Sequence, residues 1–170
     1  MGYRNKTYVA FDGDTDIKYY RMMCAWKEHE HIDFNFSNAH ALNTARDSSA
    51  EESIKAQLRL RMADSKQMLL LVGEKTRFLR KFVPWEIELA RKKDIPIVVV
   101  NLNDERTFDN DRAPAAIKDN VYTISVPFKM KIIQYALDNF PDDYHRLKND
   151  PKRQDHTYHY LDSVYTKLGL

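Results

Sequence analysis

The sequence contains few glycines and a single cysteine, and these shortages exclude several kinds of site. Only four of the 170 residues are glycine, so a glycine-rich loop that cradles phosphate groups is not expected. Cys24 has no second cysteine with which to form an intrachain disulfide, and one thiolate cannot build a structural zinc cluster. Because a chain without disulfides suits a reducing compartment, we expect a cytoplasmic protein.

Long apolar runs and a strong excess of one charge are also missing. The longest apolar run, residues 95–100, is far shorter than the ~20 residues that span a bilayer. No secretory signal pattern precedes the first apolar segment, so we expect no membrane association. The formal net charge is +2, and the tyrosine-rich carboxyl-terminal segment lacks a basic patch. We therefore expect no nucleic-acid partner.

Short apolar segments alternate with longer amphipathic segments along most of the chain. The expected strands are residues 7–11, 32–36, 68–72, 97–100 and 121–126. The expected helices lie between and after them, at residues 17–28, 49–62, 82–93 and 128–139. This alternation predicts an α/β fold of the flavodoxin-like, doubly wound kind, with five parallel strands in the order 2-1-3-4-5.

The pattern changes after residue 140. Residues 1–140 account for the whole α/β domain, whereas residues 141–170 are rich in tyrosine, histidine and lysine. A short helix is expected at residues 158–168. We therefore predict one domain over 1–140 and a short helical appendage over 141–170, packed on the domain or on a partner.

An acidic loop, Asp12–Asp16, follows the first expected strand. Its Asp-x-Asp pattern is similar to that of haloacid dehalogenase phosphohydrolases, which hold magnesium, but they need a threonine where this chain has Asp16. A receiver domain would need an aspartate at the end of the third strand, where this chain has Gly73 and Glu74. Aspartate and glycine also form turns and helix caps. The sequence favours a turn and cap here, with no metal site, and leaves metal binding by the loop as the alternative.

Glu86 lies in the first turns of the helix that follows the third expected strand. The partial positive charge of a helix amino terminus keeps a carboxylate ionised, and such a carboxylate can stabilise an oxocarbenium ion or hold ribose hydroxyls. Ile87 and Ala90 are the natural core-facing residues, so we do not expect Glu86 to point into the sheet. Acidic residues are common in first helical turns, so position alone does not make Glu86 catalytic.

The segments 65–76 and 82–90 together resemble the TIR-like domains of the Thoeris ThsB type. Those domains have a strand ending in Leu-x-Gly or Leu-x-Ser, a polar link with threonine, and an aromatic residue four positions before a glutamate. A Val/Ile-rich strand follows the helix. The corresponding residues here are Leu71, Gly73, Thr76, Phe82 and Glu86. The resemblance covers residues 7–140.

This resemblance implies an NAD⁺ glycohydrolase or ADP-ribosyl cyclase. Such domains cleave the bond between nicotinamide and ribose, so NAD⁺ or a related nucleotide would be a substrate that is consumed, with no cofactor retained. The product would be ADP-ribose, a cyclic isomer or a conjugate, which diffuses to a downstream effector in bacterial antiphage defence. Sites of this kind are often completed by a neighbouring subunit, so the resemblance also implies a homo-oligomer.

The resemblance assigns the catalytic role to Glu86. It places six further residues at the substrate site, namely Phe11, Asp12, Asn38, His40, Phe82 and Trp85. This chain departs from the family pattern in three respects, one of which is Pro84, an unusual residue in this turn. The usual tryptophan four positions before the glutamate is replaced by Phe82, with Trp85 beside the glutamate, and acidic residues replace the usual serine-rich loop after the first strand.

Two other functions fit the same sequence. Nucleoside deoxyribosyltransferases share this architecture and use a glutamate as a covalent nucleophile. A non-catalytic TIR-like adaptor or nucleotide sensor belongs to a different class, and the acidic loop Asp12–Asp16 favours it because carboxylates repel phosphates.

Overall fold

The computed structural model describes residues 6–29, 34–37, 51–118 and 121–170. Its centre is a six-stranded sheet in which every pair of neighbouring strands is parallel, in the order β2-β1-β3-β4-β5-β6. The strands are β1 (Thr7–Ala10), β2 (Phe36–Ser37), β3 (Gln67–Val72), β4 (Ile97–Asn101), β5 (Thr123–Pro127) and β6 (Thr157–His159). The predicted flavodoxin-like order of the first five strands is therefore confirmed.

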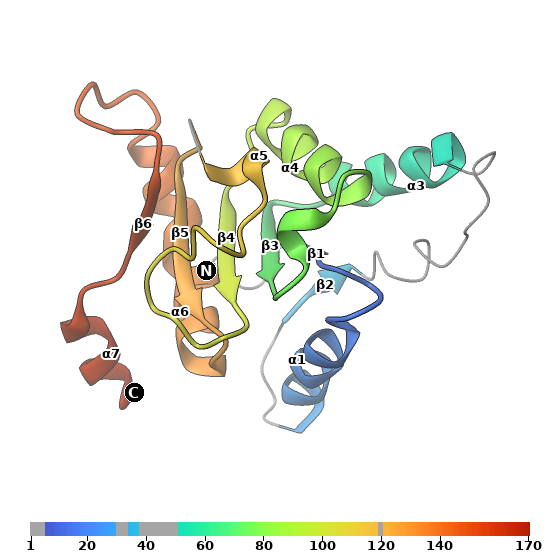
Figure 1. Cartoon of the computed structure of the whole chain (residues 1–170). Coiled ribbons are helices and arrows are strands. Elements are labelled where there is room, and N and C mark those ends of the chain that lie inside the picture. Colours follow the sequence, from blue (N-terminus) through green and yellow to red (C-terminus); the bar gives the residue numbers. More distant parts are fainter. Residues whose placement is uncertain (1–5, 30–33, 38–50, 119–120) are drawn as a thin grey trace.

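Helices cover both faces of the sheet (Figure 1). They are α1 (Ile17–His29), α3 (Glu51–Ala63), α4 (Phe82–Lys92), α5 (Ala115–Lys118), α6 (Met130–Arg146) and α7 (Asp162–Leu168), with a 3-10 turn, η3, at Thr76–Phe78. Parallel strands in such a fold need long crossover connections, and the amphipathic helices provide them.

The apolar residues of the strands divide into two cores because successive side chains point to opposite faces. One core lies under α1 and α6, and its strand residues are Val9, Leu69, Leu71, Val98, Val100, Ile124 and Val126. The other core lies under α3, α4 and α5, and its strand residues are Tyr8, Ala10, Met68, Leu70, Val72, Ile97 and Val99. β3 and β4 are buried along their whole length, as their unbroken apolar sequences indicate.

The carboxyl-terminal segment adds a strand that the sequence did not predict. α6 continues to Arg146, past residue 140 where we expected an appendage to begin. Residues 157–159 pair with β5 as β6, so residues 158 and 159, predicted as the start of a helix, are in a strand, and the helix α7 begins at Asp162. The Oγ1 atoms of Thr123 and Thr157 lie 2.7 Å apart across this pair. The ring of Tyr158 packs on the ring of Tyr122, the residue before β5, with 5.4 Å between the ring centroids.

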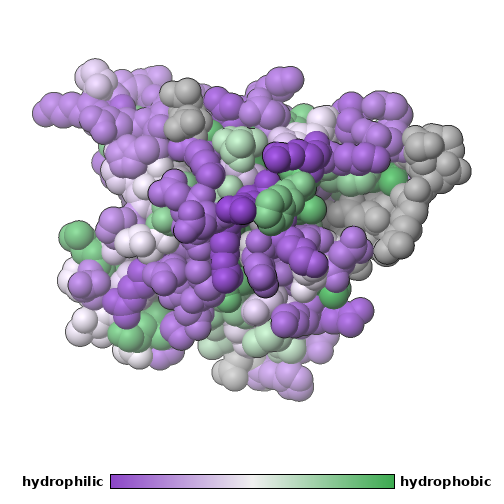
Figure 2. Space-filling view, in the orientation of Figure 1, coloured by the Kyte–Doolittle hydropathy of each residue, from purple (hydrophilic) through white to green (hydrophobic). Residues whose placement is uncertain are grey.

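The face of the molecule seen in Figure 1 is mostly hydrophilic over the described residues. In Figure 2, hydrophilic side chains cover most of the face seen in Figure 1, and hydrophobic side chains form small separate groups. No helix within the described residues is long and apolar enough to cross a membrane.

Candidate active site

Glu86 is buried between α4 and the sheet. α4 presents an inward stripe made of Val83, Glu86, Ile87 and Ala90, which have the three- and four-residue spacing of one helix face. The side chain of Glu86 is only 1% exposed. The expectation that Glu86 would not point into the sheet is therefore wrong, because its position belongs to the same stripe as the core residues.

The phenol of Tyr8 on β1 is the hydrogen-bond donor to this buried carboxylate. Tyr8 Oη donates to Glu86 Oε1 at 2.8 Å, and Tyr8 is itself fully buried. Burial raises the pKa of Glu86 to about 7, while the hydrogen bond from Tyr8 acts in the opposite direction. Burial and the nearby charge of Glu86 raise the pKa of Tyr8, so the phenol keeps its proton and remains a donor.

A carboxyl group with a pKa near 7 can change its protonation state at neutral pH. As the acid it can donate a proton or a hydrogen bond, and as the carboxylate it can stabilise a positive charge on a sugar. The strongly perturbed pKa of a buried group with one specific partner is a feature often found at functional sites. Glu86 and Tyr8 are therefore the chemically distinctive pair on this face of the sheet.

The two aromatic residues near Glu86 are only partly buried, and both pack against the core under α3, α4 and α5. Phe82 is half-buried against the apolar core under α3, α4 and α5. The ring of Trp85 lies next to α3, with Lys55 Nζ 5.7 Å and the Arg59 guanidinium carbon 5.2 Å from its centroid. Trp85 thus packs between α4 and α3 and is not among the residues that line the cavity described below.

Phe11 and Asp12 follow β1, as expected, but each is engaged in local structure. Phe11 is buried under α1 and stacks on Tyr20 with 5.1 Å between ring centroids. The Asp12 carboxylate accepts hydrogen bonds from the backbone N–H of Asp14 at 3.0 Å and from Thr15 Oγ1 at 2.8 Å. This is the turn before a helix that the acidic loop predicted. Asn38 and His40 lie outside the described residues.

A cavity of about 160 Å³ lies at the carboxyl ends of β1, β3 and β4. Its lining residues are Thr15, Asp16, Lys18, Tyr19, Gly73, Glu74, Lys75, Leu102 and Arg112. In open α/β sheets, ligands bind at this edge, where the strand order reverses. The lining comes from α1 and from the loops after these three strands, and of the predicted site residues that the structure describes, Glu86, Phe11, Asp12, Phe82 and Trp85 do not line this cavity.

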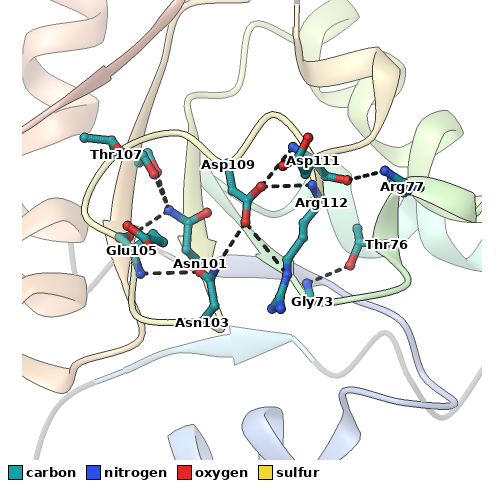
Figure 3. Close-up of polar contacts among 11 residues, drawn as sticks. Gly73, Thr76, Arg77, Asn101, Asn103, Glu105, Thr107, Asp109, Asp111 and Arg112 are labelled. Carbon is teal, nitrogen blue, oxygen red and sulfur yellow. Dashed lines mark hydrogen bonds and ion pairs between the residues drawn. The ribbon is translucent and has the colours of Figure 1, made fainter.

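Arg112 reaches the cavity because the loop after β4 is tied down by hydrogen bonds (Figure 3). The Asn101 side-chain nitrogen lies 2.8 Å from the carbonyl oxygen of Glu105 and 2.7 Å from that of Thr107. Further along, the Asp109 carboxylate accepts the backbone N–H of Arg112 at 3.0 Å and lies 3.8 Å from its Nε. The sequence analysis did not predict Arg112 as a cavity residue. Asp109, three positions earlier, is a local signal for a capped turn, but it does not indicate where the Arg112 side chain lies.

Metal ligands do not gather at this edge. Among the residues with described positions, no three His, Cys, Asp or Glu side chains lie together in a group that could hold a metal ion.

Comparison with known proteins identifies the family. A solved structure described as a conserved protein from Enterococcus faecalis V583 is 18% identical, covers 96% of this chain and 85% of that chain, and superposes with a TM-score of 0.40. The family model for the TIR-like domain of the Thoeris protein ThsB matches residues 8–107, which is more than half of the 170 residues. This match includes β1 from its second residue onward, β3, and α4 with Glu86. The chain therefore belongs to the family of ThsB TIR-like domains.

Proposed function

We propose that this protein cleaves NAD⁺ as part of Thoeris antiphage defence and that Glu86 is its catalytic residue. Two observations support the proposal. The chain belongs to the ThsB TIR-like family over the segment that contains Glu86. The observation that carries it is Glu86 itself, a buried carboxyl with a pKa of about 7 held by Tyr8.

The proposed reaction breaks the bond between the nicotinamide nitrogen and C1′ of the ribose. The bonding electrons leave with nicotinamide, which becomes neutral, and the ribose acquires oxocarbenium character. The Glu86 carboxylate would stabilise this positive charge and hold a ribose hydroxyl. Attack by water, with loss of a proton, gives ADP-ribose, whereas attack by a nitrogen or hydroxyl of the same molecule gives a cyclic isomer. NAD⁺ is thus a substrate, and a diffusible product would act on a downstream effector.

Substrate access requires a change from the described conformation. A side chain that is 1% exposed cannot contact a ligand, and Glu86 lies outside the cavity at the strand ends. We propose that the described form is a resting state and that self-association or another trigger moves α4 or its neighbours. Activity should then increase more than in proportion to protein concentration.

The test is nicotinamide release from NAD⁺, followed by chromatography. Glu86→Gln keeps the size of the side chain and removes its charge, so we expect release to fall by at least about 100-fold, the scale of losing one charge-stabilising group. Glu88→Gln is the matched control, since Glu88 lies on the same helix, pairs with Arg91 at 2.8 Å and is partly exposed. Equal activity in wild type and Glu86→Gln would contradict the assignment of Glu86.

A parallel incubation with a deoxynucleoside and a free base tests the deoxyribosyltransferase alternative. Base exchange without nicotinamide release would favour a covalent glutamate nucleophile. The NAD⁺ and deoxynucleoside reactions are separated by the products alone, so the same protein preparation serves both.

A non-catalytic adaptor or nucleotide sensor is the second candidate function. The observation that favours it is the separation of Glu86 from the cavity at the strand ends. An adaptor would bind nucleotide or partner without turnover. No nicotinamide release, at high protein concentration and in extracts of phage-infected cells, would favour this function over cleavage.

A further inference from the structure

Two cationic side chains of α3 hold the ring of Trp85 on α4. The inward stripes of the two helices share one apolar core, so α3 and α4 pack side by side (Figure 1). Lys55 and Arg59 are four positions apart and therefore lie on one face of α3. Lys55 Nζ is 5.7 Å and the Arg59 guanidinium carbon 5.2 Å from the centroid of the Trp85 ring, within the distance at which a cation is attracted to an aromatic ring.

Trp85 and Glu86 are consecutive residues of α4 with different surroundings. Glu86 is 1% exposed, whereas Trp85 is partly buried and lies outside the inward stripe of the helix. Because a helix moves as a unit over one turn, a displacement of α4 that exposes Glu86 also moves the Trp85 ring relative to α3. The contacts between Trp85 and α3 therefore oppose the exposure of Glu86.

The first turn of α3 fixes the positions of the two cations. Lys55 Nζ lies 3.0 Å from Glu51 Oε1 and 3.9 Å from Glu52 Oε1, and an Arg59 nitrogen lies 4.0 Å from Glu52 Oε2. The hydrogen bond from Lys55 lowers the pKa of Glu51, so this carboxylate is ionised at neutral pH. Exposed ion pairs contribute little to stability on their own, but these pairs limit where the cations can lie.

We propose that Lys55 and Arg59 hold Trp85, and with it α4, in the position that buries Glu86. The three side chains Lys55, Arg59 and Trp85 form an autoinhibitory contact, which we call the Trp85 clamp. Its regulatory meaning rests on the proposed function, in which NAD⁺ must reach Glu86. Trp85, which the sequence analysis placed at the substrate site, is then a positioning residue that acts through Glu86 and needs no contact with the ligand.

The size of the effect follows from the kind of contact. One cation–π contact outside a fully desolvated site changes an equilibrium by about twofold to fivefold, and two such contacts change it by roughly fivefold to thirtyfold. The buried side chains of Val83, Ile87 and Ala90 also hold α4 on the sheet, and burial of apolar area is the larger contribution. Removing the two charges should therefore increase a small open population by this factor and leave the closed form dominant.

The test is amide hydrogen exchange of the full chain. The double variant Lys55→Gln/Arg59→Gln removes both charges and keeps residues that favour a helix. Amides of α4 should exchange about fivefold to thirtyfold faster than in wild type, while those of β3 and β4 keep their rates. Arg21→Gln/Lys27→Gln is the matched control, since it removes one arginine and one lysine at exposed positions of α1, and it should leave α4 unchanged.

Two results would overturn the clamp. The first is unchanged exchange of α4 in Lys55→Gln/Arg59→Gln, and the second is equal acceleration of α4 and β3, which would show a general loss of stability. The conservative exchange Lys55→Arg/Arg59→Lys keeps both charges and should preserve slow exchange of α4. Exchange as fast as in the glutamine variant would show that charge is not what holds Trp85, and would also overturn the proposal.

Steady-state kinetics at a fixed protein concentration give a second readout. When only the open form binds a ligand, the apparent dissociation constant is the intrinsic constant divided by the open fraction. The apparent KM for NAD⁺ should therefore fall in Lys55→Gln/Arg59→Gln by about the same factor as exchange increases, with kcat unchanged. A lower kcat at an unchanged KM would show that the two charges serve the chemical step, and would contradict a positioning role.

The exchange measurement does not depend on catalysis. Faster exchange of α4 in Lys55→Gln/Arg59→Gln, without nicotinamide release by this variant or by wild type, would support the clamp while the proposed function fails. Nicotinamide release that is lost in Glu86→Gln, together with wild-type exchange and KM in Lys55→Gln/Arg59→Gln, would overturn the clamp alone.

Discussion

Replacing Tyr8 by phenylalanine removes the one described donor to Glu86 and should raise the pKa of Glu86. The ring remains, so the packing of β1 against α4 is conserved and only the phenol oxygen is lost. Tyr8 Oη lies 2.8 Å from Glu86 Oε1, and a hydrogen bond to a charged group contributes about 1.5–3 kcal/mol. At about 1.4 kcal/mol per pKa unit, the pKa of Glu86 should rise from about 7 to about 8 or 9 in Tyr8→Phe.

Carbon-detected NMR of the glutamate side-chain carboxyls measures this pKa directly. The Glu86 signal is identified by its absence from Glu86→Gln, so the assay does not depend on enzymatic activity. Tyr20→Phe is the matched control, since Tyr20 is a buried tyrosine on the opposite face of the sheet, and it should leave the Glu86 titration unchanged. A Glu86 pKa that stays the same or falls in Tyr8→Phe would refute the reasoning.

Three further predictions concern stability and can be measured by urea denaturation. In wild type, the pKa of Glu86 is near 4.5 in the unfolded chain and about 7 in the folded protein. The free energy of unfolding should therefore fall by on the order of 3 kcal/mol as pH rises through this window. Glu86→Gln should remove this fall, and an unchanged pH dependence in this variant would contradict the prediction. Gly73→Ala should lower the free energy of unfolding by about 1–3 kcal/mol because the added Cβ meets the Asp16 carboxylate. Adding Asp16→Ala to the same chain should recover most of this loss, whereas additive losses from the two substitutions would disprove the clash. Asn101→Ala should cost about 2–3 kcal/mol, since buried Asn101 holds the carbonyl groups of Glu105 and Thr107; a loss below about 0.5 kcal/mol would show that other contacts hold this loop.

The sheet could be predicted from the sequence because its strands carry their own signal. The segments at β3 and β4 are apolar at every position, which is typical of strands buried on both faces, and the helices between them have amphipathic spacing. β6 has no such signal. Its three residues are polar and aromatic and only partly buried, and it pairs with β5 through contacts that depend on the rest of the fold being in place.

The candidate site was less predictable because its geometry depends on tertiary contacts. Glu86 and Ile87 both belong to the inward stripe of α4, and sequence reasoning assigns burial to the apolar residue of such a pair. The burial of Glu86 is stabilised by a hydrogen bond from Tyr8, which lies 78 residues away in the sequence. Arg112 reaches the strand ends only through the path of the loop after β4. The side chains that meet at the strand ends come from segments far apart in the sequence and could not be derived from local pattern.

The release of nicotinamide from NAD⁺ by wild-type protein, compared with Glu86→Gln over a range of protein concentrations, tests the central claim most directly. The account predicts release that increases more steeply than protein concentration and that is lost in Glu86→Gln but retained in Glu88→Gln. Release that persists in Glu86→Gln, or that is absent from wild type at every concentration, would contradict it.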